Sequence, residues 1–170
     1  MINYILFDTK VREALKPFTF TRPVSEIRCG IITLTEKWNR RLSTKCSFKT
    51  ADYLQSKYPL HIESDNVYIN SSVFPNNEIV EAIQQLPTNS VLMSGETWIA
   101  VRCSELKSED EVANYMLVQF FGVRKSLENV WNIFQFNPDE IEADFSLITF
   151  GRVSQKLNET NRVICLENVF

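Results

Sequence analysis

The groups best suited to bind phosphate lie in the first thirty residues. An apolar run ends at Asp8, and two prolines and the arginines Arg22 and Arg28 follow within residues 15–30. A guanidinium group binds phosphate oxygens through paired hydrogen bonds and stays charged at working pH. A strand that opens into such a loop is typical of the ligand-binding edge of an α/β domain. The segment therefore predicts a site for a phosphate-bearing molecule.

Each of these residues also has a structural interpretation, and the sequence leaves both open. Arg22 and Glu26 are spaced to form an ion pair at the surface or between domains. Arg28 could instead cap a helix. An aspartate at the end of a strand, as at Asp8, is commonly a turn former.

Two apolar strands position these groups. Residues 4–7 and 66–70 are typical of strands buried on both faces. An amphipathic helix is expected over residues 78–86, capped by Asn76 or Asn77. This order predicts an α/β, Rossmann-like, three-layer domain with a mostly parallel sheet. Ligands of such sheets bind beyond the carboxyl ends of the strands. That edge adds three polar residues to the site, or to a plain turn: Asn70, Ser71 and Ser72.

Shorter segments make up the rest of the chain. Residues 11–15 predict a helical turn, residues 30–38 fit either a helix or a strand, residues 38–42 favour a helix, and residues 51–58 predict a short helix. A hairpin is expected around residues 94–96, and a helix with an acidic first turn over residues 108–115. Pro138 predicts the start of a short helix over 138–145. Three aromatic side chains nearby are expected in the core, with stacking on a base as the alternative: Trp131, Phe134 and Phe136.

Composition and charge restrict the class of partner. A net charge of -3 and a pI near 5.3 argue against a binder of nucleic acid or membrane surfaces, which needs clustered Lys and Arg. The cysteines are scattered and His61 is the only histidine, so no zinc site is expected. Reduced thiols fit a cytoplasmic protein. Neither a membrane span nor a signal peptide is expected.

The proline-arginine loop resembles the signature region of sugar nucleotidyltransferases, through Pro17, Thr19 and Pro23. The likeness is greater to a divergent bacterial group of these proteins and extends over nearly the whole chain. Its most specific part is Arg-Pro-Val-Ser-Glu-Ile-Arg at residues 22–28. The matching segments are residues 3–8, 18–30, 36–38, 68–72, 131–134, 143–145 and 151–154.

This resemblance implies a nucleotidyltransferase-like fold and transfer of a nucleotidyl group from a nucleoside triphosphate to a sugar 1-phosphate, with release of pyrophosphate. The reaction concentrates negative charge, so it needs N–H donors, cations and usually a carboxylate-bound Mg²⁺. Residues 8–15 contain no glycine, Val24 stands where the family has a lysine, and residues 70–72 contain no aspartate. Mg²⁺ is therefore possible without a clear ligand set. We expect Arg22 and Arg28 to be catalytic and the substrate to be contacted by Asp8, Arg12, Thr19, Glu26, Asn70, Ser71 and Ser72.

The same group implies the domain organisation. Its nucleotidyltransferase-like domain is usually followed by a left-handed β-helix of hexapeptide repeats. Residues 1–165 are thus expected to form the first domain and residues 166–170 the possible start of the second. Expected partners are a nucleoside triphosphate and a sugar phosphate, with no nucleic acid and no membrane, and a homo-oligomer could form through the β-helix.

The absence of the loop glycines, of the lysine and of the aspartate supports a second hypothesis. In it, the domain is a catalytically inactive sugar-nucleotide-binding or scaffold domain that docks on a hexapeptide-repeat acyltransferase-like domain or on a second copy of itself. A third reading is a small-molecule binding module unrelated to nucleotides.

Overall fold

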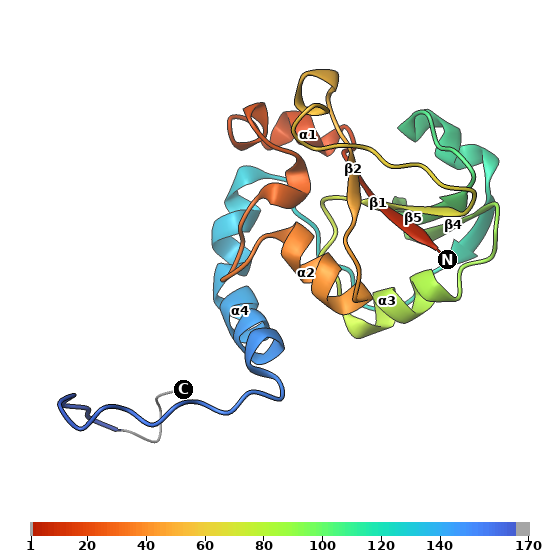
Figure 1. Ribbon diagram of the computed structural model, residues 1–170. Coiled ribbons are helices and arrows are strands. Elements are labelled where there is room, and N and C mark those ends of the chain that lie inside the picture. Colours follow the sequence, from red (N-terminus) through yellow and green to blue (C-terminus); the bar gives the residue numbers. More distant parts are fainter. Residues whose placement is uncertain (1, 166–170) are drawn as a thin grey trace.

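A computed structural model describes residues 2–165 of the chain, in which the strands form one six-stranded sheet (Figure 1). The strand order across the sheet is β2-β1-β3-β5-β4-β6. The strands are β1 (Asn3–Phe7), β2 (Ser47–Lys49), β3 (Asn66–Asn70), β4 (Ser90–Ser94), β5 (Thr97–Cys103) and β6 (Met116–Gln119).

The sheet is mostly parallel, which confirms the predicted fold class. β1 pairs in parallel with β2 and β3, and β4 pairs in parallel with β6. Only β5 runs the other way among these strands, between β3 and β4. The β4–β5 turn is the predicted hairpin, and Gly95 lies in it with a positive φ of 60°. The pattern does not predict β2 and β6, because both are short and lie at sheet edges.

Side chains along each strand point alternately to the two faces of the sheet, so the core has one part on each face. Tyr4 and Leu6 of β1 pack on one face, against side chains of α2 (Leu34–Leu42) and α3 (Asn77–Gln84). Ile5 and Phe7 pack on the other face, under the segments before β3 and after β5. Both faces of the central strands are therefore buried, as their continuous apolar runs predict.

Several short helices surround the sheet. α1 (Val11–Ala14) is the predicted turn, and Asn76 is the N-cap of α3, since its side chain accepts a hydrogen bond from the N–H of Ile79 at 2.8 Å. Residues 30–38 form a loop followed by α2, which begins at Leu34 with Thr33 as its N-cap, and Glu36 in the first turn completes the capping box. The expected helices over 51–58 and 108–115 are shorter 3₁₀ turns. The 3₁₀ helices are η1 (Phe18–Phe20), η2 (Val24–Glu26), η3 (Asp52–Leu54) and η4 (Glu109–Asn114).

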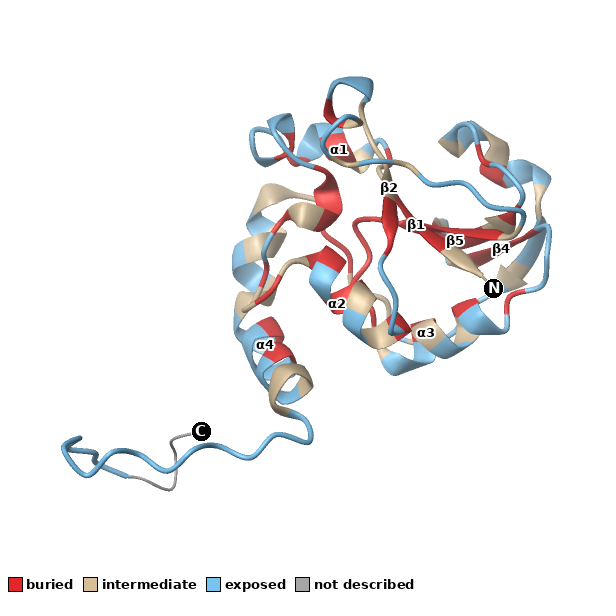
Figure 2. Ribbon diagram, in the orientation of Figure 1, coloured by how far each residue is buried: buried red, intermediate tan, exposed pale blue. Residues whose placement is uncertain are grey.

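The C-terminal helix α4 (Val130–Thr149) corrects two predictions. It is one 20-residue helix with Pro138 inside it, not a short helix that begins there. Proline removes one helical hydrogen bond, that to the carbonyl of Phe134. Pro138 is exposed, and much of the surface of α4 is exposed as well (Figure 2), so water can bind that carbonyl. The aromatic residues are not core as expected: Trp131 is 62% exposed and Phe134 84%, and only Phe136 is partly buried.

A buried ionic cluster attaches α4 to the start of α2. The Nζ of Lys37 donates to the carboxylates of Glu140, at 2.9 Å, and Asp144. Asp144 also accepts the N–H groups of Ile31 and Ile32, at 2.8 and 3.2 Å. Gly30 permits this approach: its φ is +93°, and a Cβ there would lie 2.5 Å from an Asp144 carboxylate oxygen. The cluster fixes the angle of α4 against the domain.

Residues 150–165 continue from α4 without further helix or strand and are exposed. The expected start of a β-helix at residues 166–170 lies outside the described residues. Among residues 2–165, no helix combines the length and the apolar character needed to cross a membrane.

Candidate functional site

The parallel register brings the ends of three strands together around Asp8. Phe7 pairs with both Lys49 and Asn70, so the next residues, Asp8, Thr50 and Ser71, are neighbours at the carboxyl edge. The hydroxyls of Thr50 and Ser71 donate to the Asp8 carboxylate at 2.6 and 2.7 Å. The predicted meeting of the two strand ends thus occurs.

The predicted loop folds back onto this carboxylate. The N–H of Val24 donates to Asp8 at 2.9 Å, and the guanidinium of Arg12 donates to it at 3.1 Å. The Asp8 side chain is 3% exposed and has four hydrogen-bond donors around it. Asp8 therefore joins β1, β2, β3 and the proline-arginine loop.

Arg12 is buried, and its guanidinium donates hydrogen bonds to the proline-arginine loop and to Tyr53. Its guanidinium donates to the carbonyls of Thr19 and, at 3.1 Å, Arg22, and to the hydroxyl of Tyr53 at 2.7 Å. The Thr19 hydroxyl returns a hydrogen bond to the Arg12 carbonyl at 2.8 Å. The sequence-predicted residues Asp8, Arg12 and Thr19 therefore form one internal network that shapes the loop.

A second carboxylate binds the first turn after β1. The backbone N–H of Lys10 donates to Glu109 at 2.9 Å, and the indole N–H of Trp98 donates to the same carboxylate at 3.1 Å. The Lys10 ammonium also pairs with Asp110 at 2.9 Å, in a fully exposed contact. Glu109 thus satisfies an N–H at the position where a phosphate loop would offer it to a ligand.

The two arginines expected to be catalytic lie apart. Arg22 is exposed, and its backbone carbonyl accepts from Arg12, so its position at the rim of the Asp8 network is fixed. Arg28 is also exposed, but its guanidinium donates to the carbonyl of Ile31, toward α2. Within residues 2–165, Glu26 makes no side-chain hydrogen bond or ion pair, and the alternative Arg22–Glu26 pair is not formed.

The polar residues after β3 divide between two directions. Ser71 points to Asp8, as described above, whereas the amide of Asn70 accepts from the Ser72 hydroxyl at 2.9 Å and donates to the Trp98 carbonyl at 3.1 Å. Asn70 and Ser72 are buried and order the turn. Sequence reasoning missed Thr50, Tyr53 and Glu109, whose types carry no signal without the strand register.

An open cavity of about 430 Å³ borders the network. It is lined by Arg12, Glu13, Lys16, Phe20, Ala51 and Tyr53. Lys16 pairs with Glu13 and lies over the Phe20 ring, with its Nζ 5.6 Å from the centroid. The cavity combines two cations, Arg12 and Lys16, with two aromatic rings at the edge where ligands of this fold bind.

The described residues give little indication of a metal site or of a reactive thiol. Residues 2–165 contain no group of three or more His, Cys, Asp or Glu side chains arranged to hold a metal ion. Burial raises the pKa of the Cys29 thiol to about 11 and that of Cys46 to about 12. These thiols stay protonated at neutral pH and are poor nucleophiles.

Comparison with known proteins identifies the family. A family model described as sugar nucleotidyl transferase matches residues 4–153. A structure described as a glucose-1-phosphate thymidylyltransferase from Bacillus anthracis, in complex with a sucrose, is similar in fold, with a TM-score of 0.53 and 8% sequence identity. The match covers 84% of this chain and 96% of that one. A search of curated protein sequences found no match. Because the family model matches most of the chain, the chain belongs to the sugar nucleotidyl transferase family.

Proposed function

We propose that this domain transfers a nucleotidyl group from a nucleoside triphosphate to a sugar 1-phosphate and releases pyrophosphate. One observation carries the proposal. Residues 22–28, the segment most specific to the family resemblance, contact the Asp8 network at the carboxyl edge of β1 and β3, where the N–H of Val24 donates to the Asp8 carboxylate. In open α/β sheets this edge is where ligands bind.

The reaction needs charge stabilisation more than a covalent nucleophile. An oxygen of the sugar phosphate attacks the α-phosphorus, a new P–O bond forms, and the bond from the α-phosphorus to the bridging oxygen breaks. Both electrons of that bond leave with pyrophosphate, and the sugar phosphate is already anionic, so no proton has to move. Arg22 at the rim and Lys16 in the adjacent cavity are exposed or half-exposed cations that suit the phosphates.

The donor groups present do not fit a resident Mg²⁺. Asp8, the carboxylate at the carboxyl end of β1, already accepts from Val24, Arg12, Thr50 and Ser71. Its charge is balanced by the buried guanidinium of Arg12. We therefore assign no step of the reaction to a metal, and the effect of Mg²⁺ on activity is a question for the assay below.

The same contacts favour a second candidate, a domain that binds sugar nucleotides or serves as a scaffold without turnover. Glu109 occupies the Lys10 N–H and Arg12 holds Asp8, so groups that the chemistry would use are committed within the chain. Under this candidate the rim still binds the phosphates, and the bound molecule is not converted.

Two measurements on purified protein separate these functions. Calorimetric titration with nucleoside triphosphates, sugar 1-phosphates and sugar nucleotides, with and without Mg²⁺, measures binding, and a coupled assay of pyrophosphate release measures turnover. Arg22→Ala is expected to lower kcat by about 100-fold, the effect of removing one charge-stabilising donor. Arg28→Ala tests whether the second expected catalytic position contributes to turnover, since its guanidinium donates to the carbonyl of Ile31.

The control is Arg40→Ala, since Arg40 is exposed near the end of α2 and lies away from the carboxyl edge. Activity that is lost with Arg22 and kept with Arg40 supports transfer. Binding without pyrophosphate release supports the second candidate. Absence of binding to all three ligand classes rejects both.

A further inference from the structure

β6 forms an open edge of the sheet. Within the described residues it pairs with β4 alone, at the end of the strand order. The N–H groups of Met116 and Phe120 donate to carbonyls on the β4 side, at 3.1 and 2.6 Å. Because the backbone groups of a strand point alternately to its two sides, the N–H and C=O groups of Leu117 and Gln119 point outward, away from the sheet.

The composition of this edge does not protect it against pairing. The opposite edge, at β2, is covered, because the N–H of Phe48 donates to the carbonyl of Pro59 at 3.1 Å. Residues 116–123 contain neither a charged residue nor a proline, the residues that commonly block an exposed edge. Met116 is 58% exposed and Leu117 62%. An edge of this kind accepts a further strand.

A cavity lies beside β6 on each face of the sheet, and each has a volume of about 390 Å³. The first is lined by residues of α3 and by Val118 and Phe120. The second is lined by residues of η4 and by Leu117 and Trp98. Since neighbouring side chains of a strand point to opposite faces, an added strand would present its side chains alternately to the two cavities. Cavities placed in this way give strand addition its specificity.

Each cavity has one exposed carboxylate that forms no hydrogen bond or ion pair with the described residues. Glu78 of α3 lines the first cavity, and Glu96 in the β4–β5 turn lines the second. Glu109 and Asp110 of the second cavity are different, because both already bind Lys10. Among the described residues that line the two cavities, none is Lys or Arg. Charge therefore favours a partner with a basic side chain on each face, which β6 of a second copy lacks.

The positions of the two carboxylates define a sequence pattern for the partner. A Cβ on Gly122, which follows β6, would contact a carboxylate oxygen of Glu78. Glu96 follows β4, in which Met93 pairs with Gln119, the last residue of β6. Both carboxylates thus lie toward the carboxyl end of β6. A strand parallel to β6 would need two adjacent apolar residues followed by two adjacent basic residues, one of each kind for each face, and an antiparallel strand would need the reverse order.

We propose that the open edge of β6 binds an extended segment of another protein that carries two adjacent apolar and two adjacent basic residues. The segment adds a strand to the sheet, and its backbone bonds the outward groups of Leu117 and Gln119. Its apolar side chains enter the two cavities, and its basic side chains pair with Glu78 and Glu96. Three strands lie between β6 and β1, so this surface is separate from the Asp8 network.

Fluorescence anisotropy with three labelled hexapeptides tests the pattern. Thr-Val-Ile-Lys-Arg-Thr and Thr-Arg-Lys-Ile-Val-Thr carry the adjacent basic residues in the two orders. Thr-Val-Lys-Ile-Arg-Thr has the same composition but places both basic side chains on one face. One of the first two is expected to bind about fivefold more tightly than the third, which can reach only one of the two carboxylates. Equal binding by all three refutes the pattern, and so does the absence of saturable binding up to about 1 mM.

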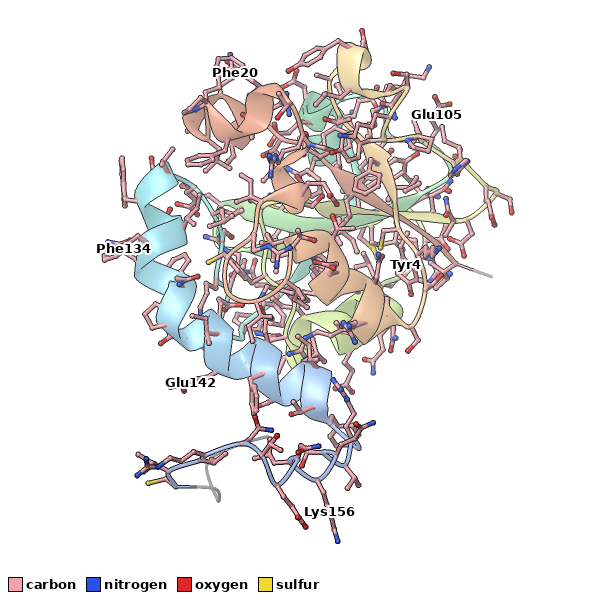
Figure 3. The ribbon with its side chains drawn as sticks, turned by 60° about the vertical axis from the view of Figure 1, so that its left-hand side comes forward. Tyr4, Phe20, Glu105, Phe134, Glu142 and Lys156 are labelled. Carbon is pink, nitrogen blue, oxygen red and sulfur yellow. The ribbon has the colours of Figure 1, made fainter. Side chains whose placement is uncertain are left out.

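Substitution of the carboxylates tests the placement of the peptide. Glu78→Gln and Glu96→Gln are each expected to weaken binding of the preferred peptide about threefold, by loss of one exposed ion pair. Glu142→Gln is the matched control, because Glu142 is an exposed carboxylate of α4 (Figure 3) and lines neither cavity. An equal loss in all three variants would mean that the net charge attracts the peptide without a defined site, and it would overturn the proposal.

Amide hydrogen exchange measured by NMR tests strand addition itself. With saturating peptide, exchange at Leu117 and Gln119 is expected to slow about tenfold or more, because their N–H groups become bonded. Exchange at Met116 and Phe120 should change less, since these groups already donate to the β4 side. Peptide binding without slower exchange at Leu117 and Gln119 rejects strand addition. Slower exchange there that grows with protein concentration in the absence of peptide assigns the edge to a second copy and also overturns the proposal.

Discussion

Replacing Asp8 by asparagine tests whether this residue is structural. The substitution preserves the volume of the side chain and removes its charge. Arg12 would then lie buried without its carboxylate partner, and the amide NH₂ would face the donors of Thr50 or Arg12. Loss of one partner of a buried ion pair destabilises a protein by about 3–5 kcal/mol. Because asparagine keeps one acceptor oxygen, we expect a loss of about 3 kcal/mol, near the lower limit of that range.

Urea unfolding followed by circular dichroism measures this loss. The free energy of unfolding of a domain this size is about 5–15 kcal/mol, so the expected change is large. Asp110→Asn is the control, because its pair with Lys10 is exposed and contributes little to the free energy of unfolding. The double variant Asp8→Asn with Arg12→Met removes the stranded guanidinium as well. It is expected to be less destabilised than the sum of the single variants.

The reasoning is refuted if Asp8→Asn unfolds within about 0.5 kcal/mol of the unmodified chain, the scatter of surface substitutions. Such a result would mean that the carboxylate contributes little to the fold and is available to a ligand. An increase in stability would point the same way, because charged groups held for function commonly reduce stability.

Three further predictions concern other parts of the fold. Gly30→Ala is expected to cost at least about 2 kcal/mol, because its Cβ would lie 2.5 Å from Asp144, whereas Gly95→Ala, with no atom within 4 Å of a Cβ, costs about 1–2 kcal/mol for its positive φ alone; equal losses in urea unfolding would contradict this. Lys37→Met leaves two buried carboxylates without their shared cation, so hydrogen exchange is expected to accelerate in α4 more than in β1, and uniform acceleration would argue against a local attachment. Burial raises the pKa of Cys46 to about 12, so the unfolded chain releases this proton first; the resulting stability is complete below the ordinary thiol pKa of about 8.5 and declines as pH rises toward 12. Cys46→Ala should therefore reduce the fall of unfolding free energy above about pH 9, and an unchanged pH profile would exclude this contribution.

The parts of the fold that were predictable are those in which apolar runs and local caps agree. β1, β3 and the β4–β5 hairpin follow from short apolar segments between turn residues, and α3 follows from its helical spacing and the cap at Asn76. The α4 helix was not predictable by the same rules, because Pro138 is a common first residue of helices. In this chain the helix begins eight residues earlier, at the capping box of Asn129 and Asn132, and continues through the proline.

The candidate site shows the limit of sequence reasoning more clearly. The residue types at Asp8, Arg12 and Ser71 indicated a polar edge, and the register of β1 and β3 places them together. The sequence could not show that the chain itself supplies their partners. Thr50 and Glu109 come from segments 42 residues from Asp8 and 99 residues from Lys10, and nothing near them in sequence marks them. Whether a carboxylate is available to a ligand depends on such distant neighbours.

The attachment of α4 also has a consequence for the order in which the chain acquires its structure. All six described strands lie within residues 3–119, whereas the contact of Lys37 with Asp144 spans 107 residues. During synthesis, which proceeds from the amino end, every strand of the sheet leaves the ribosome before α4 does. Lys37 therefore remains a hydrated surface charge on the nascent domain until α4 arrives. Burying one ammonium and two carboxylates then requires all three to meet at once, so α4 joins the sheet in a single late step.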